Sequence, residues 1–324
     1  MLLLGLQGSP RKKGNTNYLL NLFASEAEKM GCRTEIIQAD RPDLKPCIGC
    51  GFCEKKGRCA ITDDAMAEVF TLFRKADVIV AASPIFFYGI TAQLKAIIDR
   101  SQTLWSRKYV FKLADPAAHF RKGFLLSVGA TKGKTLFDGV NLTTKYFFDA
   151  VGAEFTGSLL YRSIEGIGDM EKHTGVADDV EEAVKGLLTP LISRRKVMFA
   201  CRENACRSQM AAAFTRYHAG ERIEAFSGGS QPAEEVNPGM VRAMAEKGID
   251  LAFHEPISIE QAVAEERPNM IVTMGCGETC PAVPGAEVID WDLPDPAGES
   301  EDVMRNVRDE IEKRVVALVE DLAT

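Results

Sequence analysis

The chain has 324 residues, 46% hydrophobic and 26% charged, an ordinary globular composition with room for two domains of roughly 100–200 residues each. Its net charge of −7 argues against nucleic acid or an anionic membrane surface as a partner, and no apolar run is long enough to span a membrane. Nine cysteines without a secretory signal lead us to expect a cytoplasmic protein whose thiols serve metal or redox chemistry.

The first part of the chain alternates apolar strands with amphipathic helices, the pattern of a parallel sheet covered on both faces. We expect a first domain at 1–189 and a linker at 190–195. Its predicted strands are 2–6, 34–38, 77–82, 123–128 and 154–160, and its predicted helices are 17–30, 64–75, 92–104, 136–151 and 176–188.

The second part, 196–324, follows the same plan without sharing residues with the first at fixed spacing. The predicted fold class is therefore α/β, with two parallel-sheet modules of three layers each. The predicted strands here are 196–200, 223–227, 269–274 and 287–290, and the predicted helices are 209–219, 238–247 and 300–322.

Two loops of the first module have the chemistry of a nucleotide site. The segment from Gly8 to Thr16 offers hydroxyls, free amides and a basic side chain just before a helix, which suits a phosphate. It is neither a G-x-G-x-x-G motif nor a P-loop. The segment from Ser83 to Gly89 is aromatic and follows a strand, so it can lie against a flat ring at the carboxyl edge of the sheet.

With these loops and the segment 92–100, residues 1–160 resemble the NADPH-dependent FMN reductase family, specifically its iron–sulfur flavoproteins. The resemblance implies a flavodoxin-like fold, NADPH or NADH as electron donor, and a homo-oligomer formed through this domain. It also implies an FMN site made by Ser9, Arg11, Gly14, Asn15 and Thr16 at the phosphate, and by Pro84, Ile85, Phe86, Phe87, Tyr88 and Gly89 at the isoalloxazine ring.

Four cysteines, Cys47, Cys50, Cys53 and Cys59, are close enough in sequence to reach one metal centre, and the glycines between them let the backbone curl around it. The resemblance implies a [4Fe–4S] cluster at these cysteines. A zinc site and a set of free thiols are the alternatives that the sequence leaves open.

The second module opens with a strand, a tight loop and a helix, and Cys201 stands where the loop begins. Amides at such a loop and the dipole of the following helix bind an oxyanion and favour a thiolate nucleophile. Arg207 can donate two hydrogen bonds to a tetrahedral oxyanion. The predicted oxyanion loop consists of Arg202, Glu203, Asn204, Ala205, Cys206, Arg207 and Ser208.

Three further features bear on the reaction. Asp295 follows a strand and can protonate a departing oxygen. Cys276 and Cys280 lie in a glycine-rich segment, a pair for which a hydrolytic phosphatase has no need, and no aromatic residue follows Asp295-Pro296. Together with segments such as 207–211 and 226–230, these features make residues 195–324 resemble the low-molecular-weight tyrosine phosphatase superfamily, most closely its thiol-coupled arsenate reductases.

The resemblance implies a relay: Cys201 attacks arsenate, Cys276 attacks Cys201, arsenite leaves, and Cys280 completes a final disulfide with Cys276. Cys206 is the rival resolving thiol. The expected partners are arsenate and a thiol reductant such as thioredoxin. A redox-regulated tyrosine phosphatase fused to a flavin reductase, and a non-catalytic metalloid sensor, are the alternative functions.

Overall fold

The computed structural model describes residues 1–275 and 283–322. The chain divides into two compact units, each with its own sheet. Unit 1 comprises Met1–Lys112 and Ala118–Ile192, and unit 2 comprises Leu113–Ala117 and Ser193–Thr324. The fold class is as predicted, two α/β modules with parallel sheets.

The sheet of unit 1 has five parallel strands in the order β2-β1-β3-β4-β5, which is the flavodoxin-like arrangement. In this order the strand order reverses between β1 and β3, because the chain adds β2 on one side of β1 and β3 on the other, and ligands of such sheets bind outside the carboxyl ends of the strands at that point. The central strands are fully buried because helices cover both faces. The strands are β1 Leu2–Gln7, β2 Arg33–Gln38, β3 Val78–Pro84, β4 Lys122–Gly129 and β5 Glu154–Arg162.

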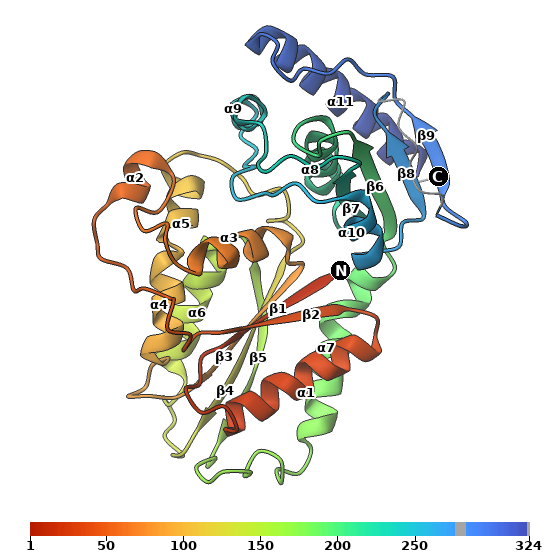
Figure 1. Cartoon of the computed structure of the whole chain (residues 1–324). Helices are drawn as coiled ribbons and strands as arrows, with labels where there is room; N and C mark the ends of the chain where they lie inside the picture. Colours follow the sequence, from red (N-terminus) through yellow and green to blue (C-terminus); the bar gives the residue numbers. More distant parts are fainter. Residues whose placement is uncertain (276–282, 323–324) are drawn as a thin grey trace. The chain divides into compact units, whose positions relative to one another are not determined.

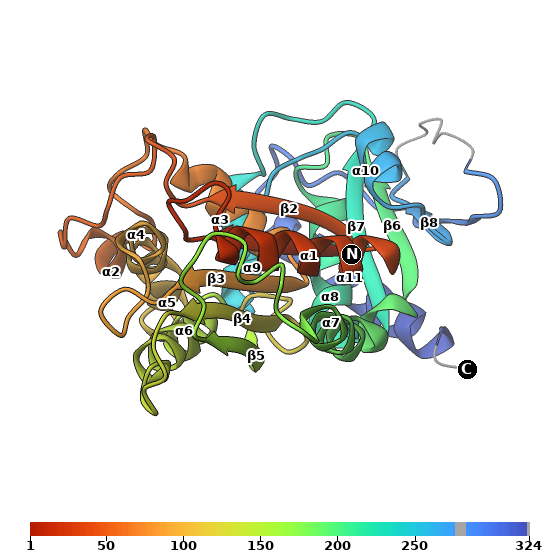
Figure 2. The same cartoon turned by 90° about the horizontal axis from the view of Figure 1, so that it is seen from below.

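Helices α1 and α7 pack against each other on one face of this sheet, and α3 to α6 lie on the other (Figures 1 and 2). Where one helix is predicted at 92–104, the structure has two, which meet at Ser101. The hydroxyl of Ser101 bonds back to the carbonyl of Ile97, a contact that bends helices. The helices are α1 Asn15–Lys29, α2 Phe52–Lys56, α3 Met66–Lys75, α4 Ala92–Arg100, α5 Gln102–Tyr109, α6 Asp138–Ala150 and α7 Val176–Ile192.

The sheet of unit 2 has four parallel strands in the order β7-β6-β8-β9. Apolar side chains of β6 point alternately to its two faces: Val197 and Phe199 join the core under α8, α9 and α11, whereas Met198 and Ala200 join the core under α10. The strands are β6 Arg195–Cys201, β7 Ile223–Gly229, β8 Met270–Thr273 and β9 Glu287–Asp290. The helices are α8 Arg207–Ala219, α9 Pro238–Glu246, α10 Ile259–Glu265 and α11 Glu301–Asp321.

Unit 2 includes a segment that lies far from it in sequence. The amide of Ala114 donates to the carbonyl of Gly248 at 2.7 Å, and the carbonyl of Ala114 accepts from the amide of Asp250 at 2.8 Å. These two bonds form a short parallel bridge to Ile249.

The region expected as a linker at 190–195 is mostly regular structure. Helix α7 continues through Pro190 to Ile192, and β6 begins at Arg195. Helix α7 packs on the sheet with a row of buried residues that ends at Leu191, which keeps its last turn helical. Among the described helices, none combines the length and apolar character needed to cross a bilayer.

Candidate active site

Cys201 is the last residue of β6, and α8 begins six residues later at Arg207. Its side chain is buried at the carboxyl end of an interior strand. Helix α8 has neither a side-chain cap nor an acidic residue in its first turn, so the positive end of its dipole is left for a bound anion.

The loop between them turns its carbonyl groups outward. The carbonyls of Arg202, Glu203 and Ala205 accept hydrogen bonds from the amides of Gln231, Ala233 and Asn237, at 2.8 to 2.9 Å. Because every described peptide bond is trans, the N–H that follows each of these carbonyls points the opposite way. The peptide N–H groups of residues 203, 204 and 206 therefore point away from the amides of Gln231, Ala233 and Asn237, which leaves them available to an oxyanion on the other side of the loop.

Asn204 holds this loop from within. It adopts a left-handed backbone conformation (φ 50°) and is fully buried. Its amide nitrogen donates to Ser208 Oγ at 2.9 Å, and its oxygen accepts from the amide of Ile257 at 2.9 Å and from Gln209 Nε2 at 3.2 Å. Gln209 and Ile257 are parts of this network that sequence reasoning missed, since nothing in their local pattern marks them.

Ser208 links this network to the nucleophile, because its hydroxyl is hydrogen-bonded to Cys201 Sγ at 3.0 Å. A hydroxyl in that position can donate to a thiolate and stabilise it. The predicted nucleophile and its supports are therefore brought together.

Arg207 and Asp295 meet beside this loop. The Nη2 of Arg207 donates to Asp295 Oδ2 at 2.6 Å, and Nη1 donates to the carbonyls of Met274 and Leu293 at 3.1 and 3.0 Å. The Nε of Arg207 is buried without a hydrogen-bond partner in the described part of the chain. Asp295 is 47% exposed, so the carboxyl group can exchange protons with solvent.

Cys206 is placed differently from Cys201. Its thiol is buried and donates to the sulfur of Met304 in α11 at 3.5 Å. Burial, and the charges of Cys201 and Asp295, raise the pKa of the Cys206 thiol well above its usual range. A thiol with a raised pKa is a poor nucleophile, which fits a packing role. Cys276 and Cys280, the expected resolving pair, lie outside the described residues.

In unit 1, the predicted phosphate loop also leads from a strand into an uncapped helix. Helix α1 begins after Gly14 with no side-chain cap and no acidic residue in its first turn. Gly8 is required at the start of the loop, because a Cβ there would lie 2.8 Å from the carbonyl oxygen of Ala82. Ser9 and Thr16 are buried, whereas Arg11 is exposed.

Asn15 is engaged within the protein. Its amide nitrogen donates to the carbonyl of Gly166 at 2.8 Å, and its oxygen accepts from the amide of Met170 at 3.1 Å. It ties the start of α1 to the segment after β5 rather than pointing freely into the phosphate loop.

The predicted aromatic loop ends in a tight turn. Phe86 and Gly89 exchange two backbone hydrogen bonds, at 2.9 and 3.0 Å, around Phe87 and Tyr88. Both central residues have positive φ, 50° and 62°, which is costly for bulky side chains and is usual at functional sites rather than in plain loops. Phe86, Phe87 and Tyr88 are exposed, and Pro84 ends β3 at its carboxyl edge. An exposed aromatic platform held under strain suits a flat ligand.

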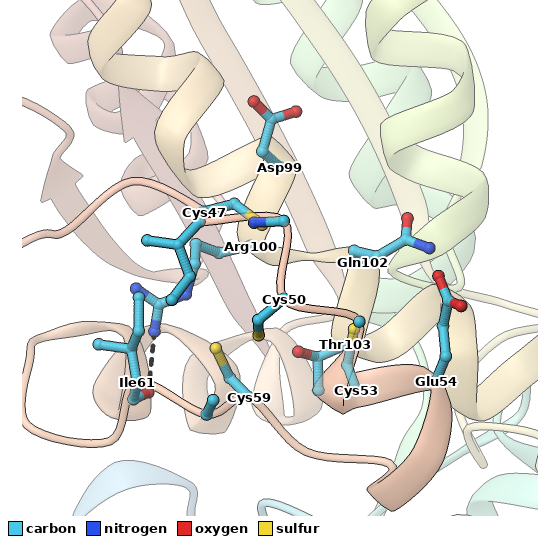
Figure 3. Close-up of a pocket in the computed structure, with 14 residues that line it drawn as sticks. Cys47, Cys50, Cys53, Glu54, Cys59, Ile61, Asp99, Arg100, Gln102 and Thr103 are labelled. Atoms are coloured by element: carbon cyan, nitrogen blue, oxygen red, sulfur yellow. Dashed lines mark hydrogen bonds between the residues drawn. The ribbon is translucent and has the colours of Figure 1, made fainter.

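Four of the five cysteines of unit 1, Cys47, Cys50, Cys53 and Cys59, line one cavity of about 150 Å³, together with residues from the start of α5 and the end of α4. Figure 3 shows the sulfur atoms of Cys50 and Cys59 pointing toward one another across it. Gly49, Gly51 and Gly57 all have φ near 65°, which curls the backbone around the cavity. The cysteines of the described residues are free thiols, and no three metal-binding side chains there converge closely enough for a single ion.

Arg100 is a residue of this cavity that sequence reasoning missed. It is 2% exposed and forms a buried ion pair with Asp64, with Nη1 2.6 Å from Oδ2. Burial lowers the pKa of Arg100, but the hydrogen bonds that it donates to Asp64 and the charge of Cys59 outweigh burial, so that the pKa is raised overall.

In a comparison with known proteins, each unit matches a different protein family. Residues 1–135 match the NADPH-dependent FMN reductase family, and residues 196–324 match the low molecular weight phosphotyrosine protein phosphatase family. An iron-sulfur flavoprotein of Methanocaldococcus jannaschii is 40% identical over 32% of this chain and 53% of its own length. The chain spans between 45% and 65% of the three iron-sulfur flavoproteins it matches first.

The relatives of unit 2 are matched almost whole. An arsenate reductase of Halalkalibacterium halodurans is 36% identical over 40% of this chain and 98% of its own length. A glutaredoxin arsenate reductase of Synechocystis is 36% identical over 39% of this chain and 96% of its own length. The chain therefore belongs, through residues 196–324, to the arsenate reductases of the low-molecular-weight phosphotyrosine protein phosphatase family, and its residues 1–135 are similar to the NADPH-dependent FMN reductase family.

Proposed function

We propose that this protein reduces arsenate to arsenite at Cys201 and that its first unit is an NAD(P)H-dependent flavin module. The observation that carries the proposal is the loop 201–208, in which the buried Cys201 is hydrogen-bonded to Ser208 and the uncapped helix that follows begins with Arg207, whose buried Nε has no partner in the described part of the chain. Arg207 has a buried Nε donor still to be satisfied, and a tetrahedral oxyanion supplies an acceptor.

The reduction of arsenate would use three thiols, those of Cys201, Cys276 and Cys280. Cys201 attacks arsenic and forms an S–As bond while Asp295 gives a proton to the departing oxygen. The thiolate of Cys276 then attacks the sulfur of Cys201, the S–As bond breaks, and its electron pair stays on arsenic, which leaves as arsenite. Cys280 attacks Cys276 in turn, so that Cys201 is released as a thiolate and the disulfide joins Cys276 and Cys280.

A phosphatase shares the first of these steps but releases phosphate by hydrolysis. The reductase assignment is supported by the names of the relatives matched almost whole and by the pair Cys276 and Cys280. The test is arsenite formed by the purified chain with thioredoxin and its reductase, beside turnover of an aryl phosphate. We expect arsenite from the native chain and none from Cys201→Ser. Turnover of the aryl phosphate without formation of arsenite would favour the phosphatase function. If the chain shows neither activity, the non-catalytic sensor is favoured.

In unit 1 the residues fit FMN. The uncapped start of α1, with Thr16 in its first turn and Ser9 and Gly14 before it, would hold the phosphate, and the strained aromatic turn at 86–89 would lie against the ring. When bound, FMN would supply hydride acceptance from NAD(P)H and the transfer of electrons singly or in pairs. The chain's part is to bind the cofactor and orient it at the carboxyl edge of β1 and β3. The test is FMN bound by the purified protein and lost in a Gly8→Val variant.

We propose that the four-cysteine cavity holds a [4Fe–4S] cluster rather than zinc. The four cysteines line a cavity of about 150 Å³, which suits a group larger than a single ion with a thiolate at each corner. About four irons and four sulfides per chain after anaerobic preparation are expected, and zinc with neither would refute the cluster.

We also propose that unit 1 forms a homo-oligomer. Trp105 and Tyr109 of α5, and Leu142 and Tyr146 of α6, are exposed on two helices that pack side by side. Apolar side chains gathered in this way are typical of a protein interface. Leu142→Glu with Tyr146→Glu should shift the mass in analytical ultracentrifugation to that of a single chain, and an unshifted mass would rule this face out.

A thiol reductant such as thioredoxin or glutaredoxin is proposed to restore Cys276 and Cys280. The flavin module is the alternative source of electrons. If it supplies them, NADPH consumption should rise with arsenate when no thiol protein is added, and that rise should vanish in Cys276→Ser. An NADPH rate indifferent to arsenate would show that the two units work separately.

A further inference from the structure

Arg100 closes the loop that carries the four cysteines. It is the last residue of α4, and its two terminal nitrogens reach both ends of that loop. Nη1 donates to the carbonyl of Lys45 at 2.8 Å, and Nη2 donates to that of Ile61 at 3.1 Å, the bond drawn in Figure 3. The same two nitrogens donate to the carboxylate of Asp64 at 2.6 and 3.1 Å. All four protons of the two terminal nitrogens are thereby used.

The fifth donor of this guanidinium, Nε–H, has no acceptor. Nε is buried and has no hydrogen-bond partner in the described part of the chain. A buried donor on a charged group destabilises the fold while it stays unsatisfied, so such a donor is expected to meet an acceptor on a ligand. Arg100 lines the same cavity as the four cysteines, and a [4Fe–4S] cluster held there would bring sulfur acceptors into it.

We propose that Arg100 Nε–H donates a hydrogen bond to a sulfur atom of the group held by Cys47, Cys50, Cys53 and Cys59, and thereby raises the reduction potential of that group. The inference rests on the proposed [4Fe–4S] cluster. Reduction adds an electron to the cluster, and a donor aimed at one of its sulfurs stabilises the more negative state. Arg100 is a positioning residue here, because it binds no iron.

The charge of Asp64 offsets the charge of Arg100. Asp64 binds both terminal nitrogens, and the side chains of the pair are each 1% exposed. The pair is therefore neutral as a whole, and the effect on the cluster comes mainly from the aimed Nε–H. Removing the charge of Asp64 should let the positive charge of Arg100 act on the cluster as well, and raise the potential further.

The test compares Arg100→Lys with a matched control, Arg107→Lys. Arg107 also donates to the cysteine loop, to the carbonyl of Gly57 at 2.9 Å, but it does not line the cavity. Each variant is prepared anaerobically, its iron, sulfide and FMN are counted, and the potential of the cluster is measured by spectroelectrochemistry. We expect Arg100→Lys to favour the oxidised cluster about tenfold, a negative shift of about 59 mV, with Arg107→Lys unchanged.

Equal potentials in the native protein and Arg100→Lys would overturn the inference. If Arg100→Lys loses its iron while keeping its FMN, the potential of the Asp64→Asn variant tests the inference instead. That variant retains Arg100, its Nε–H and its two hydrogen bonds to the backbone of the cysteine loop. A positive shift in Asp64→Asn supports the inference, and an unchanged potential overturns it. Absence of iron and sulfide from the native protein would refute the cluster itself. If iron and sulfide are present and the reduction potential does not change in the variants, only the role of Arg100 is refuted.

Discussion

Replacing Asn204 with alanine should destabilise unit 2 by removing the internal brace of the oxyanion loop. The amide of Ile257 would lose its acceptor and Ser208 Oγ would lose a donor. An unsatisfied buried N–H costs about 1–3 kcal/mol, and a lost neutral hydrogen bond costs about 1 kcal/mol. A non-glycine residue at φ 50° adds about 1 kcal/mol that asparagine largely avoids. The sum is about 3–5 kcal/mol.

The two tryptophans make this measurable in the full chain. Trp105 lies in unit 1, and Trp291 is buried in unit 2 against Phe199, with the ring centroids 5.8 Å apart. In a Trp105→Phe background, the fluorescence of Trp291 follows the unfolding of unit 2 in urea. With a slope of roughly 2 kcal/mol per molar urea, the midpoint should fall by about 1.5–2.5 M.

Asn204→Gly is the matched control, because glycine adopts positive φ without strain but lacks the side-chain hydrogen bonds. It should recover about 1 kcal/mol relative to Asn204→Ala and leave the remaining loss in place. A midpoint shift below about 0.3 M in Asn204→Ala would refute the reasoning on the brace, since it would amount to less than one hydrogen bond. Equal urea midpoints for Asn204→Ala and Asn204→Gly would refute only the contribution assigned to backbone strain at positive φ.

Three further predictions follow from other contacts. Cys206→Ala should retain arsenate reduction within about threefold, because a buried thiol with a raised pKa takes no part in the relay; loss of the Cys276–Cys280 disulfide in that variant, read by peptide mass spectrometry, would contradict this. Asp295→Asn should lower kcat for arsenate by about 10²–10⁴, while inhibition by phosphate changes little, because the acid acts on the departing oxygen; an unchanged kcat would assign protonation to another group. Phe87→Asn with Tyr88→Gly should stabilise unit 1 by about 1–3 kcal/mol in thermal unfolding of the FMN-free protein and weaken FMN binding, and tighter FMN binding would exclude the aromatic turn as the platform.

Much of the fold follows from the sequence because strand and helix periodicities are local. The strand at 287–290 is predicted to the residue, and the two sheets arise from apolar runs that helices cover. Helix α10 is missed because it is short and carries only two buried residues, Ile259 and Ala262. The break between α4 and α5 is missed because the back-bond of Ser101 is invisible in a hydrophobic pattern.

The candidate sites also contain parts that the sequence predicts and parts that it does not. The loop at 201–208 can be recognised because a nucleophile, an arginine and a strand–loop–helix plan are contiguous in sequence. Its long-range supports, such as the amide of Ile257, and the partner of the cysteine cavity, Arg100, depend on tertiary contacts between distant segments. The positive φ angles of Phe87 and Tyr88 run against the preferences of both residues, so no local rule predicts them.

The most direct test of the proposed reaction is a single turnover. The chain is reduced, freed of excess reductant and mixed with arsenate, and arsenite is counted while the cysteine peptides are mapped by mass spectrometry. We predict one arsenite per chain together with a disulfide between Cys276 and Cys280, and in Cys280→Ser one arsenite with Cys201 bound to Cys276. No arsenite, with all three thiols still free, would contradict the proposed reaction.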